Sequence, residues 1–205
     1  MNFIKTKIGN CPIENPFLFD IDDSILRHVP HIEKILRPIE EKTNPEKEKP
    51  EYIKKETNLW LEITNLVIPD ENDSEKEFHE MTEWITANLG VDVPLHFTAF
   101  HPDFKMMDKI ATPATTLTKA RAIALSKGLR YVYTGNVHDP TGGSTYCHNC
   151  GKLLIERDWY EMGEYNLVNK NQCKFCSAIC PGHFDVKPGG WGSKRMPIQI
   201  AEIPQ

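Results

Sequence analysis

The stretch Leu59-Trp60-Leu61-Glu62-Ile63-Thr64-Asn65-Leu66-Val67-Ile68-Pro69 decides the fold, because it has the composition of a buried strand that ends at a proline. A helix is expected next. Ser74 and Glu77 have the spacing of a capping box at the start of this helix. Apolar residues along one face of the helix follow them, and Gly90 ends it. Residues 94–100 then form a second predicted strand.

The same alternation continues for two more elements. A helix is predicted from Thr115 or Thr116 to the stop at Lys127-Gly128, and a third strand over residues 129–134. The order strand, helix, strand, helix, strand favours parallel strands joined by helical crossovers. Three strands make an incomplete layer, so the pattern fits either one piece of an (α/β) barrel or part of an open sheet.

These elements divide the chain into three parts. Residues 1–49 are an N-terminal segment and linker of unclear role, with helical spacing over 22–40 that prolines interrupt and a charged stretch over 40–50. Residues 50–140 form the α/β part, and residues 141–205 form a cysteine-rich module and tail. The glycines of residues 135–145 predict a flexible hinge between the last two parts.

Composition narrows the class of protein. The chain has 205 residues, of which 40% are hydrophobic and 26% charged, as in an ordinary globular protein. Its net charge of −5 gives no general attraction to nucleic acid or to an anionic membrane. The chain contains neither an apolar run long enough to span a membrane nor the apolar region of a signal peptide, so we expect a cytoplasmic protein that binds neither nucleic acid nor membrane.

The cysteine-rich module carries the most specific motif. Cys147-His148-Asn149-Cys150-Gly151 and Cys173-Lys174-Phe175-Cys176 are two C-x-x-C pairs separated by 22 residues. Each pair supplies two thiolates from a tight turn, and four thiolates complete the tetrahedron that Zn²⁺ prefers. Leu153-Leu154-Ile155, then Tyr160, Met162 and Tyr165-Asn166-Leu167, lie between the pairs and predict the two strands of a hairpin. The module is therefore predicted to be ribbon-like and to hold Zn²⁺ through Cys147, Cys150, Cys173 and Cys176.

Two other cysteines leave alternatives open. The spacing Cys173-x-x-Cys176-x-x-x-Cys180-Pro181 matches part of the motif that binds an iron–sulfur cluster in bacterial ferredoxins. The other C-x-x-C spacing of that motif is missing here. An iron–sulfur cluster and a site without metal therefore stay as alternatives to Zn²⁺. Cys11 is isolated, as a free or buried thiol would be.

Polar residues follow each predicted strand and are candidates for ligand binding: Asn72, Asp73, His101 and Asn136. In parallel α/β folds, binding sites lie at the carboxyl ends of the strands. The alternative is structural. Asn72 and Asp73 would then lead into the helix cap, while His101 and Asn136 would satisfy local backbone groups.

Four blocks of the sequence, in this order, resemble the C-terminal half of a radical S-adenosylmethionine (SAM) enzyme: residues 60–73, 94–104, 131–137 and 145–151. The group is the AmmeMemoRadiSam-system radical SAM enzymes, which are related to pyruvate formate-lyase activating enzymes. The resemblance covers residues 50–196. It implies that the three predicted strands are the last three of a partial (β/α)₆ barrel and that their loop ends face SAM. It also implies that His101 approaches the SAM ribose, with Asn72, Asp73 and Asn136 on neighbouring loops.

The chain departs from this family at its N-terminal half. The family binds a [4Fe–4S] cluster through a C-x-x-x-C-x-x-C motif, and no such motif occurs here, because five of the six cysteines lie between residues 147 and 180. The resemblance therefore implies the C-terminal portion of an enzyme that is inactive alone and needs a partner chain to supply the other half of the barrel, with a protein as one candidate substrate. Such a half barrel is expected to expose two open strand edges and the apolar face of its sheet. The alternatives are a zinc-dependent protein-interaction module and a fragment with no role of its own.

Overall fold

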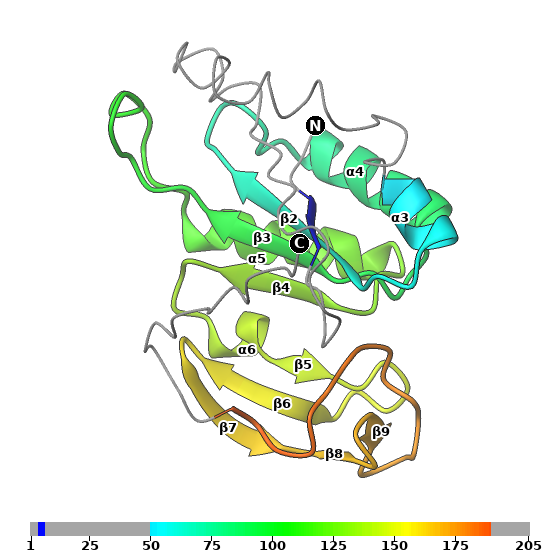
Figure 1. Cartoon of the computed structure of the whole chain (residues 1–205). Coiled ribbons are helices and arrows are strands. Elements are labelled where there is room, and N and C mark those ends of the chain that lie inside the picture. Colours follow the sequence, from blue (N-terminus) through cyan, green and yellow to red (C-terminus); the bar gives the residue numbers. More distant parts are fainter. Residues whose placement is uncertain (1–3, 7–49, 190–205) are drawn as a thin grey trace, which may run out of the picture.

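A four-stranded sheet organises the larger part of the molecule (Figure 1). The computed structural model describes residues 4–6 and 50–189. The strands lie in the order β1 (Ile4–Thr6), β2 (Leu61–Val67), β3 (Leu95–Ala99) and β4 (Val132–Gly135). The last three strands are parallel and β1 is antiparallel to β2. The predicted parallel strands with helical crossovers are thus confirmed, while the three-residue strand β1 was not predicted.

Two helices connect the parallel strands, α4 (Glu75–Asn88) and α5 (Ala114–Ser126), and α3 (Pro50–Glu56) precedes β2. The predicted capping box is present at the start of α4: the Ser74 hydroxyl accepts a hydrogen bond from the Glu77 backbone N–H, and the Glu77 carboxylate accepts one from the Ser74 backbone. Gly90 follows this helix with φ of 91°, a conformation that favours glycine.

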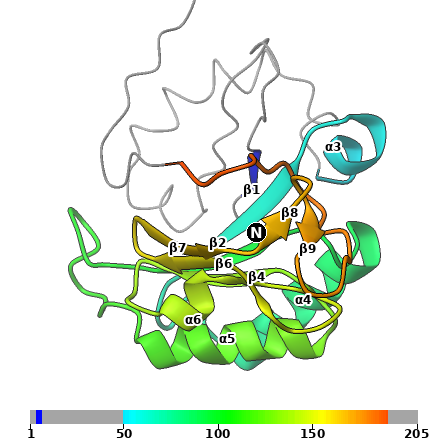
Figure 2. The same cartoon turned by 90° about the horizontal axis from the view of Figure 1, so that it is seen from below.

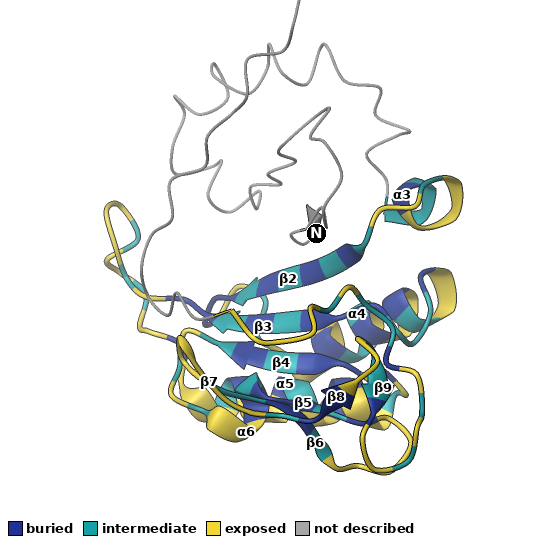
Figure 3. Cartoon of the chain, turned by 60° about the horizontal axis from the view of Figure 1, so that its bottom comes forward, coloured by how far each residue is buried: buried dark blue, intermediate teal, exposed yellow. Residues whose placement is uncertain are grey.

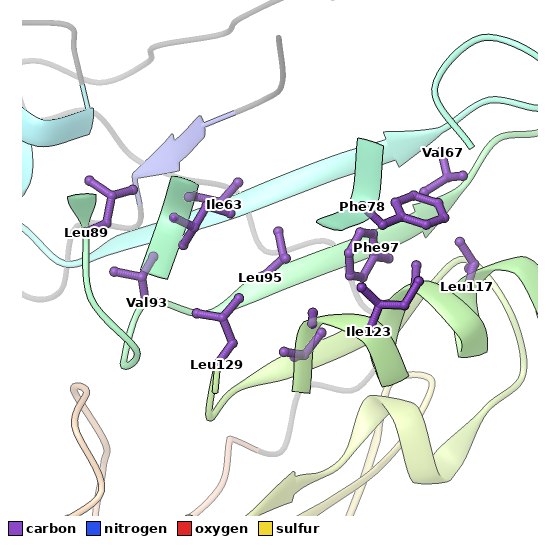
Figure 4. Close-up of a cluster of buried hydrophobic side chains, with 14 of the residues drawn as sticks. Ile63, Val67, Phe78, Leu89, Val93, Leu95, Phe97, Leu117, Ile123 and Leu129 are labelled. Carbon is purple, nitrogen blue, oxygen red and sulfur yellow. The ribbon is translucent and has the colours of Figure 1, made fainter. Parts of the chain in front are cut away.

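Both helices cover the same face of the sheet (Figure 2). Residues along the parallel strands alternate between buried and half-buried (Figure 3). The buried set packs against the helices in one apolar core that includes Ile63, Phe78, Leu95 and Phe97 (Figure 4). Phe78 of α4 meets Phe97 of β3 edge to face, with ring centroids 5.5 Å apart.

The opposite face of the sheet differs from the expectation of an exposed apolar surface. Its half-buried positions include Glu62 of β2, His96 and Thr98 of β3, and Tyr133 of β4. The period of two along a strand places these residues together on one face. This face is therefore largely polar and aromatic.

The cysteine-rich module forms two small antiparallel sheets. One contains β5 (Thr145–Tyr146), β6 (Leu153–Asp158) and β7 (Glu161–Tyr165), and the other pairs β8 (Leu167–Val168) with β9 (Gln172–Cys173). The predicted hairpin corresponds to β6 and β7, except that Leu167 belongs to β8 in the second small sheet. The expected hinge contains the short helix α6 (Pro140–Gly143) instead, because the Asp139 carboxylate accepts hydrogen bonds from the Gly142 N–H and the Thr134 hydroxyl.

A second apolar cluster joins the module to the parallel sheet. It contains Tyr131, the residue before β4, together with Cys147, Leu154, Cys173 and Cys180, and Tyr133 packs against it. None of the helices in the described ranges is long and apolar enough to cross a membrane. The helical spacing predicted over 22–40, the linker over 40–49 and Cys11 lie outside the described residues.

Candidate metal centre and adjoining cavity

The four cysteines of the two C-x-x-C pairs come together as predicted. Their sulfur atoms all lie within 4.8 Å of one another. The Sγ atoms of Cys147 and Cys176 are 3.6 Å apart, and those of Cys150 and Cys173 are 3.8 Å apart. Four sulfurs bound at about 2.3 Å to the centre of a tetrahedron are separated by about 3.8 Å. The group can therefore hold a metal ion such as zinc at a single central point.

The two pairs sit in equivalent backbone turns. The N–H of Gly151 donates to the carbonyl of Cys147 (2.9 Å), and the N–H of Ser177 donates to the carbonyl of Cys173 (2.9 Å). Both donors have positive φ, 69° for Gly151 and 61° for Ser177. The turns thus share one geometry, although only the first contains the glycine that this conformation favours.

The thiols interact strongly because they are close together. A hydrogen bond from Asn149, followed by others from the backbone of Ala178 and from neighbouring thiols, lowers the pKa of Cys176 to about 6. The hydrogen bond from the Lys152 backbone lowers the pKa of Cys150, but desolvation and the three neighbouring thiols outweigh it and raise that pKa to about 12. Thiolates are the form that binds metal, so metal uptake releases protons from this group.

Cys180 lies outside the four-cysteine group. It is 1% exposed and belongs to the apolar cluster that joins the module to the sheet. Burial raises the pKa of its thiol, which favours the uncharged form. His148 also stays outside the group, and its Nδ1 lies 3.0 Å from the hydroxyl oxygen of Tyr131. Both residues therefore connect the surroundings of the four-cysteine group to Tyr131, the residue before β4.

A cavity of about 550 Å³ lies between the polar face of the sheet and the module. The sheet contributes Glu62, His96 and Tyr133 to its wall. The module contributes Arg157, the turn at Trp159-Tyr160 and residues 180–184. A volume in this range suits a small-molecule ligand.

One chain of contacts crosses the sheet side of this cavity. The Nε1–H of Trp60 donates to Glu62 (2.9 Å), and the other carboxylate oxygen of Glu62 lies 3.0 Å from Nε2 of His96. The His96 ring stacks on Tyr133, whose hydroxyl lies 3.0 Å from the hydroxyl of Thr145. Sequence analysis did not select Glu62, His96 or Tyr133. Their shared alternation within three apolar strands is the signal that could have found them.

The polar side chains of the loop after β2 form hydrogen bonds with nearby backbone groups. The Asn72 amide accepts from the Ile68 N–H (2.7 Å) and donates to the carbonyl of Leu66 (2.9 Å). Asp73 accepts from the N–H of Asp70 (3.1 Å). These hydrogen bonds fit the structural alternative for Asn72 and Asp73, and the role of both residues toward SAM stays a prediction.

The other two candidates lie in different surroundings. His101 is exposed, and its Nδ1 lies 2.9 Å from the carbonyl oxygen of Pro102. Asn136 donates to the carbonyl of Ala99 (3.2 Å), which ties the end of β4 to the end of β3, and it also lines the cavity. Of the four predicted loop residues, only Asn136 lies in the wall of this cavity.

The fold and the site define an α/β protein with a parallel sheet and a four-cysteine group able to hold a metal ion. Uncharacterized protein MJ0808 of Methanocaldococcus jannaschii is 44% identical to this chain over 123 residues, which are 60% of the chain and 37% of the relative. The match thus spans little more than a third of the relative's length. No protein-family model and no solved structure matches the chain.

Proposed function

We propose that this chain is the C-terminal portion of a radical SAM enzyme of the activating-enzyme type, stabilised by a structural Zn²⁺ in a ribbon-like module. One observation carries the proposal: α4 and α5, the crossovers between neighbouring parallel strands, lie on the same face of the sheet. A barrel places all of its crossover helices on the outer face of the sheet, so this arrangement fits a barrel segment, and one half of a doubly wound sheet shares it. The resemblance of residues 50–196 to the family supports the same assignment.

The polar face of the sheet fits this assignment. In a barrel it would become the interior, and Glu62, His96 and Tyr133 already meet there. Asn136 would lie at the rim, where the resemblance places SAM, and His101 would lie on the neighbouring loop. Asn72 and Asp73 would shape the loop after β2.

Zinc is the metal that fits the four-cysteine group best. The converging sulfurs match one tetrahedral ion, and a four-iron cluster would instead require each thiolate to bind a different iron. The chain has no C-x-x-x-C-x-x-C motif for a catalytic cluster. We therefore assign SAM cleavage to a complex with a partner chain that supplies the cluster, and none to this chain alone.

The test is a complementation assay. The chain is expressed together with the cluster-bearing half of a radical SAM barrel, reconstituted anaerobically with iron and sulfide, and assayed for 5′-deoxyadenosine. We expect product from the pair and none from this chain alone. A pair with an intact cluster whose SAM cleavage is the same with and without this chain would contradict the assignment. Product from the isolated chain would contradict its inactivity alone.

An exposed apolar loop favours a second candidate, a zinc-dependent protein-interaction module. Phe104, Met107 and Ile110 are 71%, 67% and 67% exposed on the loop after β3. Exposed apolar side chains that gather on one loop suit contact with another protein, either a partner chain or a protein substrate. Replacing Phe104 and Met107 by serine separates the two functions. The double variant should lose partner binding whether the chain is part of a radical SAM enzyme or an interaction module. It should reduce SAM cleavage only if the chain is part of the enzyme.

A further inference from the structure

We infer that the cavity between the sheet and the cysteine-rich module binds a small anionic molecule with a planar ring, and that Arg157 recognises its carboxylate or phosphate. The inference does not depend on SAM chemistry, because it rests on side chains that already line the cavity. It assigns a class of ligand to this cavity, which metal binding by the four cysteines does not require.

The charge of Arg157 is the first observation. Its Nη1 donates to the Thr145 hydroxyl (2.7 Å) and to the carbonyl of Gly143 (3.4 Å). Both acceptors are neutral, and within residues 4–6 and 50–189 no carboxylate pairs with this guanidinium. Two of its nitrogens, Nε and Nη2, form no hydrogen bond to that part of the chain. A half-buried guanidinium in this state is a site for a bidentate carboxylate or phosphate.

The carboxylates of the cavity have other partners. Glu62 interacts with Trp60 and His96 through its two oxygens. Asp139 accepts from Thr134 and Gly142. Because both acids are held by these contacts, neither is placed to neutralise Arg157, and an external anion is the complementary group.

Aromatic side chains supply the second half of the site. Arg157 lies over the Tyr133 ring, with 5.8 Å from its central carbon to the ring centroid, so its orientation is fixed at the cavity wall. Trp159 and Tyr160, in the turn between β6 and β7, line the same cavity although they are 59% and 64% exposed. Large aromatic side chains left exposed beside a cavity favour a planar partner that stacks on them.

The experiment uses two matched pairs of probes, which separate a carboxylate ligand from a phosphate ligand. Indole-3-acetate is compared with 3-methylindole, and AMP with adenosine, by isothermal titration calorimetry on the full chain with metal bound. No SAM, iron or sulfide is added, so the result is independent of the proposed enzyme. We expect the charged member of at least one pair to bind about tenfold more tightly than its neutral counterpart, as for a charge-assisted hydrogen bond.

Substitutions test whether Arg157 causes the preference for the charged probe. Arg157→Gln should remove the preference for the charged probe, Arg157→Lys should keep part of it, and Arg130→Gln is the matched control on the surface, where Arg130 pairs with Asp92. Equal binding of charged and neutral probes, absence of binding, or an unchanged preference in a folded Arg157→Gln would each overturn the inference. If Arg157→Gln loses its metal or its fold, Tyr160→Ala decides, because it should weaken both members of the preferred pair by at least about threefold. Unchanged binding to that variant overturns the proposed stacking.

Discussion

The His96 ring stacks on the Tyr133 ring, with centroids 4.9 Å apart and planes 24° from parallel. The two residues are directly opposite each other on the parallel strands β3 and β4. Cross-strand pairs of this kind stabilise a sheet by about 0.2–1 kcal/mol. Because Glu62 contacts the same imidazole from β2, the three strands present one connected row of polar and aromatic groups toward the cavity.

Loss of one metal-ligating thiol should release the metal. We expect about one zinc ion per purified chain, as a single tetrahedral site requires, and its loss from Cys150→Ser after dialysis against a chelator. Cys180→Ala is the matched control and should keep its zinc, because Cys180 lies outside the four-cysteine group. Elemental analysis of the three proteins checks this, and several irons per wild-type chain would contradict a zinc site.

Metal removal should loosen the module and leave the parallel sheet intact. The four ligands join two turns whose shared apolar cluster is small beside the core of the parallel sheet, so the metal contributes directly to the folding of this part. After chelation, hydrogen exchange should accelerate over residues 145–184 and stay slow over 61–67 and 95–99. Equal acceleration in both parts would show that the metal stabilises the whole described fold.

The two turns of the four-cysteine group predict opposite effects of a glycine. Ser177→Gly should raise the free energy of unfolding by about 0.5–1 kcal/mol, because it places glycine at positive φ. Gly151→Ser makes the reverse change at the equivalent position and should lower the free energy of unfolding by a similar amount. Thermal unfolding of the metal-bound proteins measures both, and changes of the same sign would refute the equivalence of the turns.

Asn65 is a polar residue in the apolar core. It is 2% exposed, and its Oδ1 accepts no hydrogen bond from the part of the chain that the structure describes. Such a buried acceptor costs about 1–3 kcal/mol. Asn65→Val should therefore raise the free energy of unfolding in urea by about 1 kcal/mol. Asn65→Asp should lower it, because that change buries a charge, and a stabilised aspartate variant would show that this site is solvated.

The capping box of α4 should be worth about 1 kcal/mol. Ser74→Ala removes the hydroxyl that accepts from the Glu77 N–H, and its cost should appear as a lower urea midpoint with an unchanged slope. Thr118→Ala is the control: it removes an exposed hydroxyl inside α5 and should change stability by less than about 0.5 kcal/mol. Equal losses in the two variants would mean that the cap contributes nothing specific.

Local signals in the sequence predicted the parallel sheet and the four-cysteine group because each is encoded in short stretches. The apolar run at 59–68, the capping box at Ser74 and the C-x-x-C pairs all act over a few residues. The cavity depends instead on packing between parts far apart in the chain. Nothing near Arg157 in the sequence indicates that it would lie over Tyr133, and nothing in Ile4–Thr6 indicates pairing with β2.

Asn72 illustrates the other limit of sequence reasoning. An asparagine after a parallel strand is a ligand candidate, and here its amide also closes the turn after β2 through the backbone of Leu66 and Ile68. The same residue type suits both purposes, and only the position of the neighbouring backbone groups distinguishes them.

The apolar cluster that Tyr131 shares with Cys147, Leu154 and Cys173 affects how this gene could be rearranged. A recombination breakpoint within α6 would separate Tyr131 from the rest of this cluster. One product would then expose Tyr131, and the other would lose the side chain that packs against its cysteines and Leu154. Exchange between relatives therefore keeps this cluster intact when it carries residues 131–184 together. The loop after β3, with its exposed Phe104 and Met107, is a safer place for an insertion, because its sequence can change without opening either core.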